Sequence, residues 1–167
     1  EAGRCVADGE LGELWVKTPT CAIGYWNQLA RTRRAFVGEW LRTGDKYLLR
    51  SDGVFVYHGR ADDMFKVSGI WVSPFEVEDA LVSHPSVREA AVVPARDEDG
   101  LIKPRAFIVL CAAAAQDGGQ LFEELKSHVK NAIGPWKYPR WINVLDELPK
   151  TSSGKVQRYL LRDMTGD

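Results

Sequence analysis

Lys155 stands near the end of the chain in a segment of small and polar residues, Thr151-Ser152-Ser153-Gly154-Lys155. A Gly-Lys pair suggests phosphate binding, because a primary ammonium is a compact charge that suits a phosphoryl oxygen or a carboxylate. The segment is not a Walker A loop, since Pro149 stands where the first Gly is needed and Val156 where Ser or Thr would ligate Mg²⁺. What remains is a Lys on a flexible loop that can enter and leave a site. Taken alone, an ordinary solvated Lys is the favoured interpretation.

Asp45 ends the run Trp-Leu-Arg-Thr-Gly-Asp, in which Thr43-Gly44-Asp45 is predicted to form a tight turn. An ionised carboxylate held by such a turn can accept a pair of hydrogen bonds from a ribose diol. The alternative is a β-turn Asp whose side chain bonds only its own backbone, and that alternative is favoured for an isolated Thr-Gly-Asp.

The stretch from Tyr57 to Gly69, YHGRADDMFKVSG, holds an Arg, two adjacent carboxylates, a Lys and two Gly. We interpret it as a hinge between the end of one domain and a complete smaller domain. Arg60 has a structural alternative, a surface salt bridge with Asp62 or Asp63. Gly69 has a physical reason to be Gly, because a missing side chain lets a thin ligand lie against the backbone. The turn of a hairpin would also explain Gly69, and both explanations can hold together.

Size and composition limit the function classes. The 167 residues suffice for one ordinary domain, or for a small domain with a fragment attached. Hydrophobic residues make up 45% and charged residues 27%, and the formal net charge is -1, so nothing favours a nucleic-acid or membrane partner. No apolar run approaches the roughly 18 residues of a membrane span. The widely spaced Cys5, Cys21 and Cys111 indicate neither a zinc site nor a disulfide framework, and a reducing cytoplasm is the expected location.

The first sixty residues are predicted to be mostly β-strand with tight turns. A short helix is expected over 27–36. Strands are expected over 12–18, 47–49 and 54–57, with a hairpin turn at 51–53 whose Gly favours a positive φ. The chain starts at Glu1 with sequence typical of the middle of a domain, so we expect a piece of a longer protein.

A strong helix start follows the hinge. Ser73 is expected to cap the helix, Pro74 occupies its first position, and Glu76 is expected to complete a capping box. The helix should run to about Ser83, because His84-Pro85 stops it.

The remaining segments combine strands with helices. A second helix is predicted over 121–133, where Leu121, Leu125, Val129 and Ile133 recur at every fourth position. The other expectations are a small hairpin at 64–67 and 71–72, strands at 87–95, 105–111 and 141–145, a flexible surface connection at 116–119, and a short helix in the tail. Because strands and helices do not strictly alternate, we predict an α+β fold for the domain, with a short hairpin and a three-stranded sheet flanked by helices.

Four segments together resemble one family. The tail PKTSSGKVQR is similar to the closing motif of the adenylate-forming acyl-CoA ligase superfamily, which also holds luciferases and peptide-synthetase adenylation domains. The Thr-Gly-Asp motif, the hinge stretch and the upstream GELWVKTPTCAIGYWN resemble three more family elements, in the family's order. These motifs cover essentially the whole chain. The runs KVSGIWVSPFEVE and GPWKYPRWI look most like benzoate-CoA ligases and related aryl-CoA ligases.

The resemblance implies a role for each candidate residue. Lys155 would contact the substrate carboxylate and the α-phosphate during adenylation, where a fixed positive charge stabilises the transition state. Asp45 would bind the ribose hydroxyls of ATP, and Arg60 would make a second contact there. Asp62 would be the hinge residue, whose main-chain torsions swing the small domain between two positions. Gly69 would lie against the pantetheine arm of CoA.

The resemblance also implies a reaction and a missing part. The parent enzyme would convert an aromatic carboxylate such as benzoate or hydroxybenzoate, with ATP, to an acyl-adenylate and pyrophosphate, and then transfer the acyl group to CoA. Mg²⁺ would travel with ATP, because the sequence offers no carboxylate cluster for a metal cage. The family's phosphate loop and adenine motif are absent. We therefore expect residues 1–61 to be the β-rich end of a large N-terminal AMP-binding domain, residues 62–167 to be the mobile C-terminal domain, and the fragment alone to be inactive.

Two other functions remain open at this point. An adenylation domain that loads a carrier protein would use the same motifs with a tethered pantetheine as acceptor. A non-catalytic α+β binding module would be consistent with the composition alone.

Overall fold

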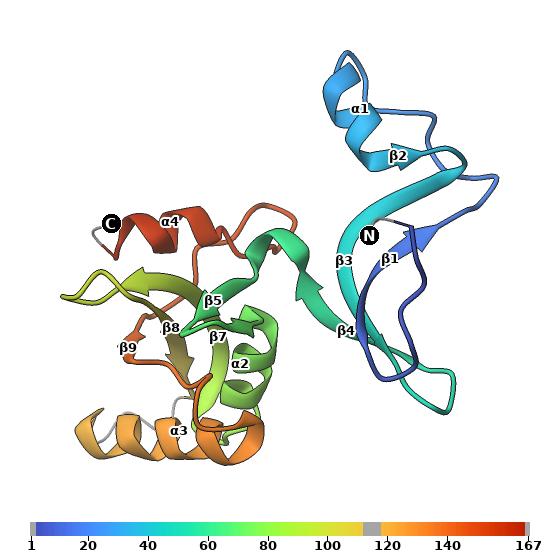
Figure 1. The fold of residues 1–167 in the computed structure, drawn as a ribbon. Coiled ribbons are helices and arrows are strands. Elements are labelled where there is room, and N and C mark those ends of the chain that lie inside the picture. Colours follow the sequence, from blue (N-terminus) through green and yellow to red (C-terminus); the bar gives the residue numbers. More distant parts are fainter. Residues whose placement is uncertain (1–2, 112–117, 166–167) are drawn as a thin grey trace. The chain divides into compact units, whose positions relative to one another are not determined.

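The computed structural model describes residues 3–111 and 118–165 of the chain (Figure 1). The chain forms two compact units, Glu1–Asp62 and Asp63–Asp167. The mixture of small sheets and helices confirms the predicted α+β class. In the described part of the chain, no helix is long and apolar enough to cross a membrane.

The first unit is an antiparallel sheet organised around its longest strand, β3 (Trp40–Leu49). Strand β1 (Leu11–Val16) pairs along β3, while β2 (Phe36–Val37) pairs with the start of β3 and β4 (Phe55–Arg60) with its end. The helix α1 (Leu29–Ala35) precedes β2. The predicted helix and strands are present, and β2 was not predicted.

The turn predicted at Thr43-Gly44-Asp45 does not end the strand, because β3 continues through these residues to Leu49. The three residues form a bulge instead: between the pairs Glu13↔Lys46 and Trp15↔Arg42, three β3 residues face one residue of β1. A bulge accommodates turn-like torsions inside a strand, and Gly44 has a φ of +74° there. The local conformation is therefore tight although the strand is not interrupted.

The second unit is built on a three-stranded sheet in the order β7-β8-β9. Strands β7 (Val87–Arg96) and β8 (Ile102–Leu110) are antiparallel, and β9 (Trp141–Val144) is parallel to β8. The hairpin of β5 (Phe65–Val67) and β6 (Ile70–Val72) and the helix α2 (Pro74–Val82) precede the sheet. The helices α3 (Gly118–Ile133) and α4 (Arg158–Asp163) complete the unit.

Each face of the sheet supports its own apolar core, because neighbouring strand residues point to opposite faces. Val92 of β7 and Ile108 of β8 belong to a core that includes α2 and α3. Val93 and Phe107 belong to a second core that includes Leu161 of α4. Figure 1 accordingly shows α3 and α4 on opposite sides of the sheet.

Two predictions about helix ends were wrong. Ser73 does occupy the N-cap of α2 with Pro74 next to it, but its side chain makes no capping hydrogen bond. Both carboxylate oxygens of Glu76, which was expected to complete the capping box, accept hydrogen bonds from Lys137 Nζ at 2.7 Å. Helix α3 begins at Gly118, within the predicted connection 116–119, of which residues 116–117 lie outside the described residues.

Candidate functional site

Asp45 and Arg60 lie directly opposite each other on β3 and β4. Arg60 Nη1 donates hydrogen bonds to Asp45 Oδ1 at 3.0 Å and to the carbonyl oxygen of Thr43 at 2.9 Å. The Asp45 side chain is 29% exposed and that of Arg60 46%. Among the described residues, only one Asp45 carboxylate oxygen has a hydrogen-bond donor. The pair therefore offers a ligand a free acceptor oxygen next to a guanidinium.

The bulge in β3 holds this pair in place. Thr43 Oγ1 donates to the carbonyl oxygen of Leu14 on β1 at 2.9 Å and accepts the N–H of Asp45 at 3.1 Å. A Cβ added at Gly44 would lie 2.9 Å from Arg60 Nη2. Gly44 is favoured by its positive φ, and a side chain at this position would also displace the Arg60 guanidinium. The structure shows that the Thr-Gly-Asp motif and Arg60 form one constellation.

The charge of Arg60 is stabilised within this constellation. Burial lowers the pKa of the guanidinium, but the hydrogen bond from Arg60 to Asp45 and the negative charges of Asp45 and Asp62 raise it above its ordinary value. Arg60 also lies near Asp62, with 3.7 Å between Nη2 and Oδ2. The predicted surface salt bridge with Asp62 and the contact with Asp45 therefore exist together.

Lys155 lies on a loop that closes on itself between Lys150 and Val156, which form an isolated β-bridge. The N–H of Thr151 donates to the carbonyl oxygen of Lys155 at 2.8 Å, and the N–H of Lys155 donates to Thr151 Oγ1 at 3.1 Å. The loop thus has a defined local geometry. Within residues 3–111 and 118–165, no acceptor pairs with the Lys155 ammonium, and the residue is exposed. A cation held in this way is available to an anionic ligand.

Gly69 and Ser68 form the tip of the β5–β6 hairpin, with φ values of +86° and +49°. Both are the torsions of a tight hairpin turn, so the structural explanation for Gly69 is correct. The residue is exposed, and nothing lies within 4 Å of a Cβ added there. The space next to the Gly69 Cα is therefore open to a ligand.

Asp62 lies in η1 (Ala61–Asp63), a single 3₁₀ turn between β4 and β5. Its side chain is 88% exposed. The boundary between the two compact units falls immediately after this residue. The structure brings Asp45 and Arg60 together in the first unit, whereas Lys155 and Gly69 lie on separate loops of the second unit.

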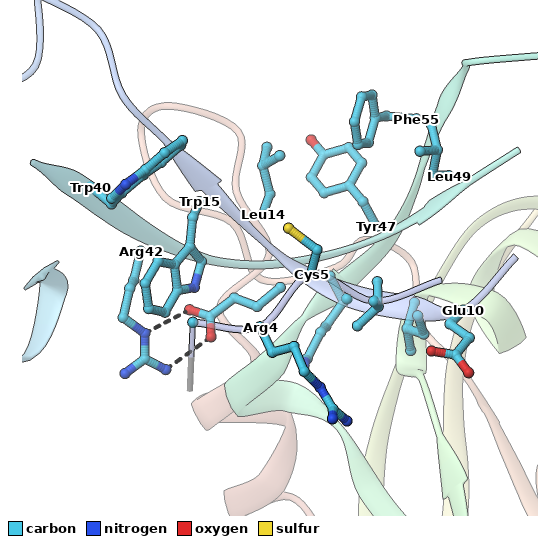
Figure 2. Close-up of a pocket in the computed structure, with 16 residues that line it drawn as sticks. Arg4, Cys5, Glu10, Leu14, Trp15, Trp40, Arg42, Tyr47, Leu49 and Phe55 are labelled. Atoms are coloured by element: carbon cyan, nitrogen blue, oxygen red, sulfur yellow. Dashed lines mark hydrogen bonds and ion pairs between the residues drawn. The ribbon is translucent and has the colours of Figure 1, made fainter. Parts of the chain in front are cut away.

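Sequence reasoning did not identify a cavity of about 630 Å³ on the first unit. Figure 2 shows aromatic side chains from β1, β3 and β4 around it, beside Arg42, which is hydrogen-bonded to Glu13. None of the predicted site residues lines it. Its aromatic lining residues are Trp15, Trp40, Tyr47 and Phe55. They are spread along three strands, so no local sequence pattern joins them.

Sequence reasoning also missed Glu78 and Arg158, which form a largely buried ion pair with 2.7 Å between Arg158 Nη2 and each carboxylate oxygen. Arg158 belongs to the quoted tail motif, but its partner is 80 positions away. In the described residues, no group of three or more His, Cys, Asp and Glu side chains could hold a metal ion.

Comparison with known proteins gives concordant matches. Residues 76–155 match the AMP-binding enzyme C-terminal domain. The chain is 67% identical to a 4-hydroxybenzoate-CoA/benzoate-CoA ligase of Rhodopseudomonas palustris, covering 99% of this chain and 31% of the relative. It is 56% identical to a benzoate-CoA ligase of Thauera aromatica, covering 92% of this chain and 29% of the relative. The chain thus spans about a third of the length of these relatives.

The chain is also similar to solved structures of aryl-CoA ligases. A benzoate CoA ligase from Burkholderia xenovorans LB400 matches with a TM-score of 0.87 and 51% identity, covering 97% of this chain and 32% of that one. The anthranilate CoA ligase AuaEII in complex with anthranoyl-AMP matches with a TM-score of 0.90 and 44% identity, covering 98% of this chain and 31% of that one.

Proposed function

Because this chain belongs to the AMP-binding enzyme C-terminal domain family through residues 76–155, we propose that it forms the C-terminal part of an ATP-dependent aryl-CoA ligase. The observation that carries the proposal is the 67% identity to a 4-hydroxybenzoate-CoA/benzoate-CoA ligase over nearly the whole chain. The substrate would be an aromatic carboxylate such as benzoate or a hydroxybenzoate.

The reaction has two halves. In the first, a carboxylate oxygen attacks the α-phosphorus of ATP, so that the acyl-adenylate forms and pyrophosphate leaves. In the second, the thiol sulfur of CoA attacks the acyl carbon, a thioester forms and AMP leaves. Mg²⁺ would bind through the phosphate oxygens of ATP, since such ions keep most of their waters and need few protein ligands.

The first unit would serve the nucleotide. The free carboxylate oxygen of Asp45 suits a ribose hydroxyl, and Arg60 orients that carboxylate while adding a second donor. The aromatic cavity of the same unit supports its assignment as the β-rich end of a larger domain, because exposed apolar patches of this kind mark interaction sites.

The second unit would act as the mobile domain. The exposed ammonium of Lys155 suits the negative charge that builds as carboxylate attacks phosphorus. The exposed tip at Gly69 suits the pantetheine arm of CoA, which must pass close to a backbone. The 3₁₀ turn at Asp62 would be the pivot that exchanges these two loops at the reaction centre.

The test uses the full-length protein that contains this chain. With benzoate and ATP we expect release of pyrophosphate, and after addition of CoA the formation of benzoyl-CoA and AMP. An aliphatic carboxylate of similar charge is the control for the acyl specificity, and a carrier protein in place of free CoA tests the acceptor. The absence of ATP-dependent pyrophosphate release with every aromatic carboxylate offered would contradict the proposal. The 167-residue chain alone should form no acyl-CoA.

A further inference from the structure

The outer edge of the second unit's sheet contains a buried backbone donor with an unusual partner. Strand β7 is the edge strand, so its outward N–H groups have no neighbouring strand to accept them. At Val92 the backbone N–H donates instead to Glu78 Oε1 of α2 at 2.7 Å. Both residues are buried, and a buried N–H must find an acceptor. Glu78 therefore closes the sheet edge from the α2 side.

Arg158 reaches the same carboxylate from the other side of the sheet. It is the first residue of α4, whose Leu161 lies in the core opposite to that of α2. Its Nη2 lies 2.7 Å from both oxygens of Glu78. The ion pair thus connects the layers on the two faces of the sheet around the edge of β7.

We expect the Glu78–Arg158 ion pair to add little to the stability of the second unit. Burial raises the pKa of the Glu78 carboxyl above its ordinary value, although Arg158 and the Val92 N–H act in the opposite direction. Among the described residues, Arg158 Nε is also buried without a hydrogen-bond partner. Buried ion pairs of this kind are often replaceable by apolar residues with no loss of stability. What such a pair supplies is a fixed, directional geometry.

The geometry that it fixes is that of the Lys155 loop. Arg158 follows Lys155 by three positions and anchors the downstream end of the loop. The upstream end is anchored by Lys150, which forms an ion pair with Glu89 of β7. Next to these two anchors, the N–H of Gln157 donates to the carbonyl oxygen of Pro149 at 2.8 Å and closes the base of the loop.

We propose that Glu78 is a positioning residue for adenylation: through its bond to Arg158 it holds the loop in the orientation from which the Lys155 ammonium meets the reacting phosphate and carboxylate. This inference rests on the proposed role of Lys155. A small displacement of a charged group from its productive position costs catalysis steeply. Glu78 itself touches no substrate, and it acts through the loop.

The first experiment separates the half-reactions in the full-length protein. For Glu78→Gln we expect the kcat of benzoate adenylation to fall by about 10- to 100-fold, because the ammonium is misplaced in the transition state. Thioester formation from supplied benzoyl-adenylate and CoA should be unchanged, since the Lys155 loop is not used in that half. The matched control is Glu76→Gln, which breaks a carboxylate–cation pair on the same helix, with Lys137 instead of Arg158. It should leave adenylation unchanged.

The second experiment asks whether the effect passes through Lys155. In a Lys155→Ala background, Glu78→Gln should lower the residual adenylation rate by less than about twofold, because coupled residues are not additive. A purely structural role would lower the rate by the same factor in both backgrounds. If Lys155→Ala alone leaves adenylation intact, the proposed function of the loop fails. If Lys155→Ala abolishes adenylation but folded Glu78→Gln does not impair it, only the present inference fails.

A third variant guards against loss of folding. Glu78→Gln combined with Arg158→Met leaves no unpaired buried charge and keeps an acceptor for the Val92 N–H, so the domain should fold and retain thioester formation. It lacks the directional bonds between the two side chains, and adenylation should still be impaired. Wild-type adenylation by this variant, or a parallel fall of both half-reactions in every Glu78 variant, would overturn the proposal.

Discussion

The neighbouring residues Asp62 and Asp63 are tied to different units. Asp62 Oδ2 lies 3.7 Å from Arg60 Nη2 of the first unit, and Asp63 Oδ1 accepts a hydrogen bond from Arg162 Nη2 of the second unit at 3.3 Å. The boundary between the units passes between the two carboxylates. Each carboxylate is paired within its own unit, so neither pair has to break when the ψ of Asp62 and the φ of Asp63 change, the peptide bond itself remaining planar.

This arrangement predicts that Asp62→Pro separates the two half-reactions of the full-length protein. Proline fixes the φ of residue 62 near −65°, a value that a 3₁₀ turn allows, and so excludes arrangements that need another φ at this position. It also disfavours helical torsions at Ala61 before it. We expect thioester formation to be impaired more than adenylation, as measured with supplied benzoyl-adenylate and by pyrophosphate release. Asp62→Ala, which removes the carboxylate but leaves the torsions free, is the control. An overall rate equal to that of the wild type would contradict the hinge.

Removal of the Lys155 ammonium should impair only the first half-reaction. We expect Lys155→Ala to lower the kcat of adenylation by about 10²- to 10³-fold, the usual cost of losing one preorganised electrostatic group. Transfer from supplied acyl-adenylate to CoA should proceed at the wild-type rate. Lys126→Ala is the control, because Lys126 pairs with Glu123 on α3 and should affect neither half. Equal losses in both halves would count against a role specific to adenylation.

Local patterns in the sequence were sufficient where a structural element is itself local. The four apolar residues predicted for one face of residues 121–133 lie in or against one core in α3. The strand predicted at 105–111 starts too late, since β8 begins at Ile102. Pro104 lies opposite Pro94 of β7, and neither residue has an N–H to donate. The two prolines therefore leave no N–H of the opposite residue without a partner, and the pairing of the strands extends past them to Arg96 and Ile102.

The constellations of the candidate sites could not be obtained in the same way. Asp45 and Arg60 were identified separately, and only the strand pairing and the bulge at Gly44 show that they touch. Glu78 had no sequence feature to mark it, because a carboxylate on a predicted helix is usually solvated. Its burial results from the edge of β7, a tertiary feature that residue types and spacing do not contain.

The Asp45–Arg60 pair predicts a specific defect in ATP binding. Asp45→Asn keeps the shape of the side chain but removes the charge that accepts hydrogen bonds, and such charged bonds are worth about 1.5–3 kcal/mol. We expect the KM for ATP to rise by roughly tenfold or more, with a smaller change in the KM for benzoate. Asp52→Asn is the matched control, because Asp52 pairs with Arg50 in the same unit but lies in a hairpin turn. An unchanged KM for ATP would exclude the ribose role.

Substitution at Gly69 distinguishes its two explanations. Asn tolerates left-handed torsions better than other residues, so Gly69→Asn should cost little in folding while it places a side chain on the exposed hairpin tip. We expect a raised KM for CoA and slower thioester formation, with adenylation unchanged. Gly53→Asn is the control, because Gly53 has a φ of +82° and equally open surroundings in a turn of the first unit. If both variants behave as the wild type, Gly69 serves the turn alone.

The ionisation of Glu78 predicts how the stability of the second unit changes with pH. Burial raises the folded-state pKa of this carboxyl above 4.5, so between the unfolded and the folded pKa the folded state binds more protons than the unfolded state. The stabilising contribution of Glu78 is therefore fully present below about pH 4.5 and is lost as the pH rises through the folded pKa. Hydrogen exchange of the buried β8 amides measures the free energy of unfolding for this unit.

Relative to Glu78→Gln, the wild-type unit should lose stability as the pH rises from about 4.5 toward neutrality. Glu123 is a control of opposite sign: its hydrogen bond with Lys126 lowers the pKa of the Glu123 carboxyl. Its contribution is present above the unfolded pKa and is lost as the pH falls through the folded pKa, so Glu123→Gln should change the pH dependence in the other direction. A wild-type unit that gains stability over Glu78→Gln with rising pH would show that the bond to Arg158 outweighs the cost of burial.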